Sequence, residues 1–223
     1  TFQTEKMLLE YCGVGGTMDT QVLSFQRLAW RVLQETGGGI RPVINDQGKS
    51  LVLRLLLEQN SPKLKAFRRV MEKPGFLAKL RECLAEFKIY QVPGEKLRQC
   101  LQELAGEENE DLQAKLEDLL LIYTAYQQYI SSKYLDSDDY LQLLAEKLHS
   151  APLLNGAEVW IDGFYGFTPS ELEVLRELMI KVPQVNICLS IDPGCLKRRL
   201  EETDLFFPPW DTYQRLLYIA QEV

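Results

Sequence analysis

The stretch AEVWIDGFYGFTPSE, Ala157–Glu171, decides how the fold of this chain is interpreted. It begins as a short apolar run, places Asp162 at the end of that run, and turns through glycine and aromatic residues. Thr168 can then cap a helix whose first position is Pro169, with Glu171 completing a capping box. The stretch therefore predicts a strand that ends near Asp162 and leads into a helix.

A second apolar pattern follows this helix. The segment QVNICLSID, residues 184–192, alternates apolar and polar residues and ends in Asp192. A strand–helix–strand unit predicts two parallel strands joined by a right-handed crossover. Because the carboxyl ends of parallel strands share an edge, we expect Asp162 and Asp192 to lie at the same edge.

An aspartate at such a strand end can be a magnesium-nucleotide ligand, or it can simply favour a turn through local hydrogen bonds. Water activation needs a second acid beside the metal-binding one, and Gly163 cannot supply it. The two glycine-rich runs, CGVGGT at residues 12–17 and TGGGIR at residues 36–41, also lack the G-K-[ST] ending of a phosphate loop. An intact ATPase is therefore not supported by these residues.

Helical spacing dominates the rest of the chain. Apolar residues recur at three- and four-residue spacing through most of residues 49–149. A shorter strand is predicted at DTQVLSF, residues 19–25. The fold class is therefore α/β, mainly α by content, with a core at residues 1–36 and 155–223 and an all-helical insertion at residues 37–154.

The net charge of −7 argues against a generic, charge-driven nucleic-acid binder. The charge is uneven, however, because the basic segment Lys63–Lys88 holds eight Lys and Arg residues against three glutamates. It is either a solvated helix face or a surface that follows phosphates. No apolar run is long enough to span a bilayer, and we expect a cytoplasmic protein without membrane contact.

Three other patterns each have two interpretations. The four tyrosines between residues 123 and 134 could stack on bases or pack in a helical core. The acids of LDSDDY, residues 135–140, resemble a metal cluster, but Asp136 or Ser137 capping a helix explains them without metal. Trp30 and Leu33, on the helix after Ser24, are expected in the core.

Together these residues resemble a known family. VWIDGFYGFTPSELEVL, residues 159–175, is similar to the Walker B region of superfamily 1 helicases, with Asp162 on the magnesium-binding aspartate and Gly163 on the catalytic glutamate. Its D-G-F-x-x-F-T-P form looks like that of the AddB/RexB subunits of bacterial AddAB/RexAB helicase–nucleases. VLSFQRLAWRVLQETGG, residues 22–38, resembles a second helicase motif.

The resemblance implies a partial P-loop NTPase-like core with its phosphate loop upstream of Thr1, and a vestigial nucleotide/Mg site at Asp162 and Asp192. It places DNA at the junction formed by Ser24, Phe25, Gln26 and Arg27. The family implies ATP/Mg and an iron–sulfur cluster for the full-length subunit. No cofactor is expected in this stretch, and its cysteines are not assigned as cluster ligands.

The function implied is a degenerate, non-hydrolysing helicase-like domain in double-strand-break repair and recombination. It would contribute to recognition of the Chi sequence on single-stranded DNA, contact double-stranded DNA, and bind an AddA-type helicase–nuclease subunit. Two alternatives stay open: an active ATPase whose phosphate loop lies upstream, and a pure protein-interaction module.

Overall fold

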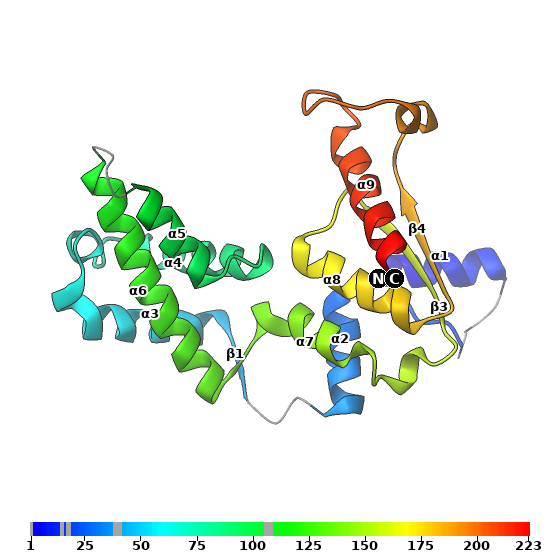
Figure 1. Cartoon of the computed structure of the whole chain (residues 1–223). Coiled ribbons are helices and arrows are strands. Elements are labelled where there is room, and N and C mark those ends of the chain that lie inside the picture. Colours follow the sequence, from blue (N-terminus) through cyan, green and yellow to red (C-terminus); the bar gives the residue numbers. More distant parts are fainter. Residues whose placement is uncertain (1, 14–15, 17–18, 38–41, 105–108) are drawn as a thin grey trace. The chain divides into compact units, whose positions relative to one another are not determined.

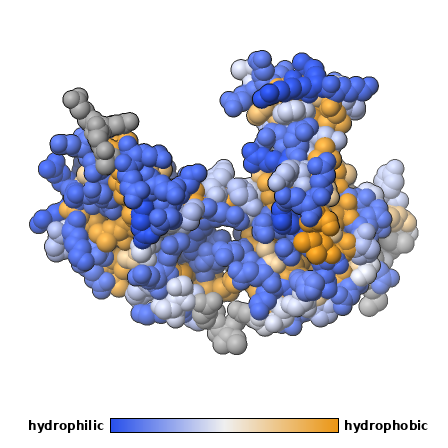
Figure 2. All heavy atoms as spheres, in the orientation of Figure 1, coloured by the Kyte–Doolittle hydropathy of each residue, from blue (hydrophilic) through white to orange (hydrophobic). Residues whose placement is uncertain are grey.

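The computed structural model of this chain describes residues 2–13, 16, 19–37, 42–104 and 109–223. The described chain is mainly helical and contains two separate two-stranded parallel sheets (Figure 1). It divides into two compact units, which we call unit 1 (residues 1–38, 140–167 and 171–223) and unit 2 (residues 39–139 and 168–170). On the face seen in Figure 2, hydrophobic residues gather in patches within each unit, among residues that are mostly hydrophilic.

Unit 1 contains the strand–helix–strand segment, and the sequence predicted it correctly. Strands β3 and β4 are parallel, with Val159 opposite Val185 and Ile161 opposite Ile187. Its elements are α1 (Phe2–Cys12), α2 (Phe25–Thr36), α7 (Tyr140–Leu148), the 3₁₀ helix η4 (Pro152–Leu154), β3 (Glu158–Phe164), α8 (Pro169–Lys181), β4 (Gln184–Leu189), the 3₁₀ helix η5 (Pro193–Lys197) and α9 (Phe207–Glu222).

The core of unit 1 forms on one face of this small sheet. Leu175 and Leu178 of α8 are buried, and Ile161, Val185 and Ile187 pack in the same cluster. Alternate strand residues point away from that core, so Glu158, Trp160 and Asp162 are exposed, as the period of two in a strand requires. Helices α2 and α7 contribute further apolar side chains to the cluster.

Unit 2 is built from helices that surround one apolar cluster. Ile122, Tyr123, Tyr126 and Ile130 form a buried stripe along its longest helix, so the tyrosines pack in the core at this point. Its elements are β1 (Val43–Ile44), α3 (Asp46–Asn60), η1 (Ser61–Lys63), η2 (Phe67–Arg69), α4 (Phe76–Ile89), α5 (Gly94–Leu104), α6 (Glu110–Lys133), β2 (Leu135–Asp136) and η3 (Ser137–Asp139).

Three features of unit 1 differ from the sequence predictions. Residues 19–24 form no strand, because a strand needs a pairing partner and none lies beside them in the described chain. Trp30 is 57% exposed rather than buried, whereas Leu33 is buried as expected. Helix α7 groups with unit 1 instead of the helical insertion, because Leu144 and Leu148 pack in its core.

Within the described ranges, no helix combines the length and the apolar character that a membrane span requires.

Candidate functional site

The first candidate site lies at the carboxyl ends of β3 and β4. Asp162 is exposed near the end of β3, and Asp192 follows β4 by three residues. The Asp192 carboxylate accepts a hydrogen bond of 2.8 Å from the backbone N–H of Gly194 and so caps η5. The parallel pairing places both aspartates toward the same end of the sheet, as the sequence predicted.

The backbone explains why a glycine follows Asp162. Between Ile161 and Phe164, β3 has one more residue than the matching part of β4, so the strand contains a bulge. Gly163 lies in this bulge with a φ of +83°. Since side chains disfavour this left-handed region, the bulge favours glycine at the position where a catalytic carboxylate would be needed.

The side chains present at this edge do not fit a magnesium-nucleotide site. Gly163 supplies no ligand, and the Asp192 carboxylate is engaged by a backbone N–H. Across the described part of the chain, no three His, Cys, Asp or Glu side chains gather in a way that could hold a metal ion. The same finding applies to an iron–sulfur cluster, which is held by four cysteine thiolates or by cysteine with histidine.

Replacing Gly163 with alanine is expected to lower the free energy of unfolding of unit 1 by about 1–2 kcal/mol, the cost of a left-handed non-glycine residue. A Cβ at this position would meet no atom within 4 Å, so the loss comes from the backbone alone. Urea unfolding measures it. Gly16→Ala is the control, because Gly16 has equally open surroundings without a positive φ. Equal stability of the two variants would contradict the prediction.

The start of α2 contains the four residues assigned to DNA contact. Ser24 caps the helix, because its Oγ accepts a hydrogen bond of 3.3 Å from the backbone N–H of Arg27. Phe25 points inward, where its ring centroid lies 5.5 Å from that of Phe164. Gln26 and Arg27 are exposed. The structure therefore leaves Gln26 and Arg27 accessible to a ligand, while the partly buried Phe25 packs against the core of unit 1.

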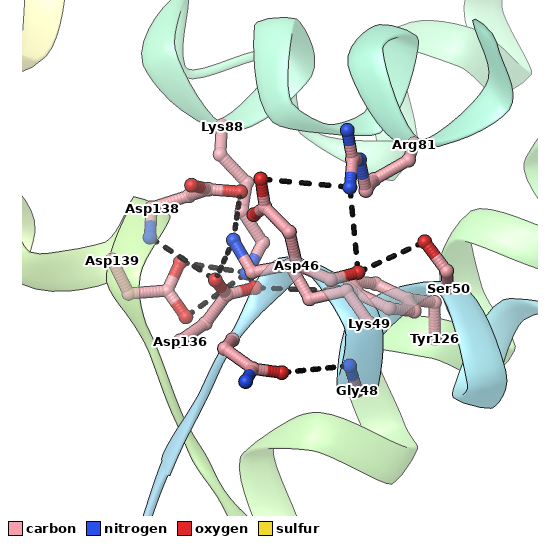
Figure 3. Close-up of polar contacts among 11 residues, drawn as sticks. Asp46, Gly48, Lys49, Ser50, Arg81, Lys88, Tyr126, Asp136, Asp138 and Asp139 are labelled. Carbon is pink, nitrogen blue, oxygen red and sulfur yellow. Dashed lines mark hydrogen bonds and ion pairs between the residues drawn. The ribbon is translucent and has the colours of Figure 1, made fainter. Parts of the chain in front are cut away.

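A second polar site, which the sequence analysis did not predict, lies inside unit 2 (Figure 3). The Asp136 carboxylate lies 2.6 Å from Lys49 Nζ and 2.6 Å from Lys88 Nζ. Lys49 also pairs with Asp138 at 2.7 Å, and Lys88 with Asp139 at 2.9 Å. Lys49 and Asp136 are 2% and 1% exposed. We call these five residues the ion network.

The ion network joins elements that are distant in sequence. Lys49 comes from α3, Lys88 from α4, and Asp136 from β2, where it is opposite Ile44 of β1. From α6, the Tyr126 hydroxyl donates a hydrogen bond of 3.3 Å to Asp136. A buried charge is stable only when it is paired, so Asp136 fixes these elements against one another. The expectation that Asp136 or Ser137 caps a helix is confirmed for Asp136, whose Oδ1 accepts a hydrogen bond of 3.0 Å from the backbone N–H of Asp138 in η3. The sequence did not predict that the same carboxylate is buried between two lysines.

The electrostatics of the network keep its central pair ionised. Burial would raise the pKa of Asp136, but Lys88 and Lys49 outweigh it, and this pKa lies below its ordinary value. Burial would lower the pKa of Lys88, but Asp139 and Asp136 outweigh it, and this pKa is raised. For Asp139, burial prevails over Lys88 and raises the pKa. Asp136 and Lys88 therefore exchange no proton near neutral pH, and the network is structural.

Another buried carboxylate holds the loop between α3 and α4. Asp118 of α6 is 1% exposed and accepts hydrogen bonds from the backbone N–H groups of Lys65, Ala66 and Phe67, the closest at 2.7 Å. This loop continues into Arg68 and Arg69, which are exposed. Asp118 therefore fixes the backbone from which two arginines extend.

The basic segment Lys63–Lys88 is only partly a solvated helix face. Lys65 pairs with Glu117, Lys79 with Glu82 and Arg81 with Asp46, while Lys88 is buried in the ion network. Four exposed members form no ion pair with any residue that the structure describes: Lys63, Arg68, Arg69 and Lys73.

Helical spacing contained a signal for these buried charges. Lys49 lies three, four and seven residues before Val52, Leu53 and Leu56, on the buried stripe of α3. Asp118 lies four and eight residues before Ile122 and Tyr126 on the buried stripe of α6. A charged residue at an apolar stripe position indicates a buried partner, which the sequence alone does not identify.

Comparisons with known proteins cover the whole chain. The family model described as "ADDB, N-terminal" matches residues 1–223. The chain is 44% identical over 221 residues to the B-type subunit of the ATP-dependent helicase/deoxyribonuclease of Heliobacterium modesticaldum, covering 99% of this chain and 18% of that protein. The proteins of the same description from Moorella thermoacetica and Bacillus cereus strain B4264 are 43% and 41% identical, over 99% and 100% of this chain and 19% of each relative. The chain thus spans about a fifth of the length of these relatives.

Proposed function

Because this chain belongs to the AddB N-terminal family, we propose that it is a helicase-like domain of the AddB-type subunit of a bacterial ATP-dependent helicase/deoxyribonuclease, and that it hydrolyses no ATP itself. Its role is that of a scaffold in double-strand-break repair. It contributes to the binding and Chi recognition of single-stranded DNA, contacts double-stranded DNA, and binds an AddA-type partner.

The observation that carries the proposal is Gly163 in the bulge after Asp162. The parallel pair β3–β4 with α8 between its strands is the arrangement expected of one edge of a P-loop NTPase-like core. In an active motor of that class, the residue after the magnesium-binding aspartate supplies a carboxylate. Here the backbone at Gly163 has a φ of +83°, so glycine suits the position and a side chain does not.

On this proposal, Asp162 is the remaining aspartate of a former nucleotide-binding site and has no catalytic role. A motor that activates water uses a second acid beside the metal-binding one, and Gly163, the residue after the exposed Asp162, cannot supply it. A scaffold role agrees with the rest of the chain, since its buried charges hold helices together and are closed to a substrate.

The proposal is tested on the complex of the full-length AddB-type protein with its ATP-hydrolysing partner. In a complex whose partner is inactivated for hydrolysis, we expect no residual DNA-dependent ATP turnover. With an active partner, Asp162→Ala in this chain is expected to leave turnover within about twofold of wild type, a difference of under 1 kcal/mol in activation free energy. Residual turnover that disappears on Asp162→Ala would show a working nucleotide site.

A further inference from the structure

A loop of unit 2 concentrates positive charge in a chain that is acidic overall. Residues 63–73 hold five Lys and Arg residues against one glutamate, Glu72, although the whole chain has a net charge of −7. Lys65 pairs with Glu117, while the other four basic residues are exposed and form no ion pair with any residue that the structure describes. We call these four residues the basic loop: Lys63, Arg68, Arg69 and Lys73.

The backbone that carries the basic loop is fixed by contacts within unit 2. The buried Asp118 accepts hydrogen bonds from the backbone N–H groups of residues 65–67. The next two turns are closed by the N–H of Val70, which donates to the carbonyl of Phe67 at 3.0 Å, and by the N–H of Lys73, which donates to the carbonyl of Val70 at 2.9 Å. Because this backbone is already ordered, a ligand has to order only side chains, which lowers the entropic cost of binding.

The surface around the basic loop offers charge without an apolar anchor. In residues 56–89, all of which the structure describes, no large hydrophobic side chain is exposed. Phe67 and Phe76 pack against the core of unit 2, with their ring centroids 5.2 Å apart. Stacking of unpaired bases needs an exposed aromatic ring, and protein interfaces depend on aromatic or other large anchor residues that become buried. The basic loop supplies neither, so its charges fit a phosphate backbone best.

We propose that the basic loop binds the phosphate backbone of duplex DNA. The inference rests on the proposed function, which includes a contact with double-stranded DNA, and it assigns that contact to a site. Guanidinium groups bind phosphate oxygens through charge-assisted hydrogen bonds, and lysine binds them as a point charge. Charges on a fixed backbone match the regular phosphates of a duplex better than those of a flexible single strand. Since phosphate contacts carry no sequence information, the loop positions the duplex without sequence preference.

Lysine footprinting locates the contact independently of other DNA sites in the complex. The intact helicase–nuclease complex, without ATP or magnesium, is acetylated with and without a blunt-ended duplex, and the modified lysines are identified by mass spectrometry. We expect the duplex, but not an oligothymidylate, to protect Lys63 and Lys73, while Lys96 and Lys133, which are exposed on other parts of unit 2, stay equally reactive. Duplex protection elsewhere in this chain that spares Lys63 and Lys73 would overturn the basic loop and leave the proposed duplex contact standing. No protection at any lysine of this chain would count against both.

The salt dependence of duplex binding measures the phosphate contacts. Arg68→Gln combined with Arg69→Gln is expected to reduce the slope of log K against log salt by about 1.8, because each phosphate contact on B-DNA contributes about 0.9. Arg54→Gln combined with Arg98→Gln is the matched control. It removes the same charge from two exposed arginines of unit 2 that each pair with a glutamate on their own helix, and it is expected to leave the slope unchanged. Equal slopes for the two double variants would overturn the proposal. Unchanged duplex binding with weakened binding of the AddA-type partner would also overturn it, and would identify the basic loop as a protein interface.

Discussion

Replacing Asp136 with asparagine is expected to destabilise unit 2 by about 3–5 kcal/mol, the range for removing one partner of a buried ion pair. Asparagine keeps the shape of the side chain but removes the charge between Lys49 Nζ and Lys88 Nζ, each 2.6 Å away. The two ammonium groups would keep the carboxylates of Asp138 and Asp139, at 2.7 and 2.9 Å, but lose the central charge that pairs with both. Urea unfolding followed by circular dichroism of the helices measures the loss.

The matched control for Asp136 is the exposed pair of Arg54 and Glu58 on α3, which lie 3.2 Å apart. Glu58→Gln is expected to cost less than about 1 kcal/mol, because exposed ion pairs contribute little. If Asp136→Asn and Glu58→Gln lower stability by equal amounts, the ion network does not hold unit 2 together.

The pH dependence of stability follows from the same groups. The pKa of Asp136 is lowered by folding, so its contribution is present above the unfolded pKa and is lost as the pH falls through the folded pKa. The pKa of Asp139 is raised by folding, so protonation of Asp139 on acidification favours the folded state. Its effect on stability is therefore opposite to that of Asp136. The pKa of Lys88 is raised, so its contribution is present below the unfolded pKa and is lost as the pH rises through the folded pKa. Asp136→Asn is therefore expected to make the free energy of unfolding fall less steeply as the pH is lowered.

Replacing Asp118 with alanine is expected to cost about 3 kcal/mol, because it leaves three backbone N–H groups without an acceptor, and each such group costs about 1–3 kcal/mol when buried. Partial access of water to the loop keeps the total near the lower end of that sum. Asp118 has this effect because both of its oxygens accept, one from Lys65 and the other from Lys65, Ala66 and Phe67. Urea unfolding measures the change in stability.

Hydrogen exchange at the three amides gives a local readout of the same prediction. In the Asp118→Ala protein, the amides of residues 65–67 are expected to exchange faster than the rest of unit 2. Lys115→Ala is the control, because Lys115 is exposed on the same helix and surface substitutions usually change stability by less than about 0.5 kcal/mol. Unchanged protection of these amides without Asp118 would show that other groups hold the loop.

Sequence patterns within a few residues of one another correctly predicted the strand–helix–strand unit. The alternation in residues 184–192, the apolar run before Asp162 and the helix start at Pro169 gave the parallel pair β3–β4 and the helix between its strands. The same reasoning failed for residues 19–25, because strand character does not supply a pairing partner. It also failed for Trp30. A large aromatic residue was expected in the core, but Trp30 lies on the side of α2 opposite the buried Ala29, Val32 and Leu33.

The polar interior could not be predicted in the same way. Lys88 and Asp136 are 48 residues apart, and only the folded helices bring them together. Gly163 shows the reverse case. Its identity suggested a lost carboxylate, and only the φ of +83° in the bulge explains why glycine is suited to that position.

Among the residues that the structure describes, the two apolar clusters share no buried residue, since one contains Leu144, Leu175 and Leu178 and the other contains Leu53, Ile122 and Ile130. Each cluster can lose its packing while the other keeps it, so heating is expected to give two overlapping heat-absorption peaks. A single melting temperature would then average two different events, and a variant should be compared within the unit that it alters.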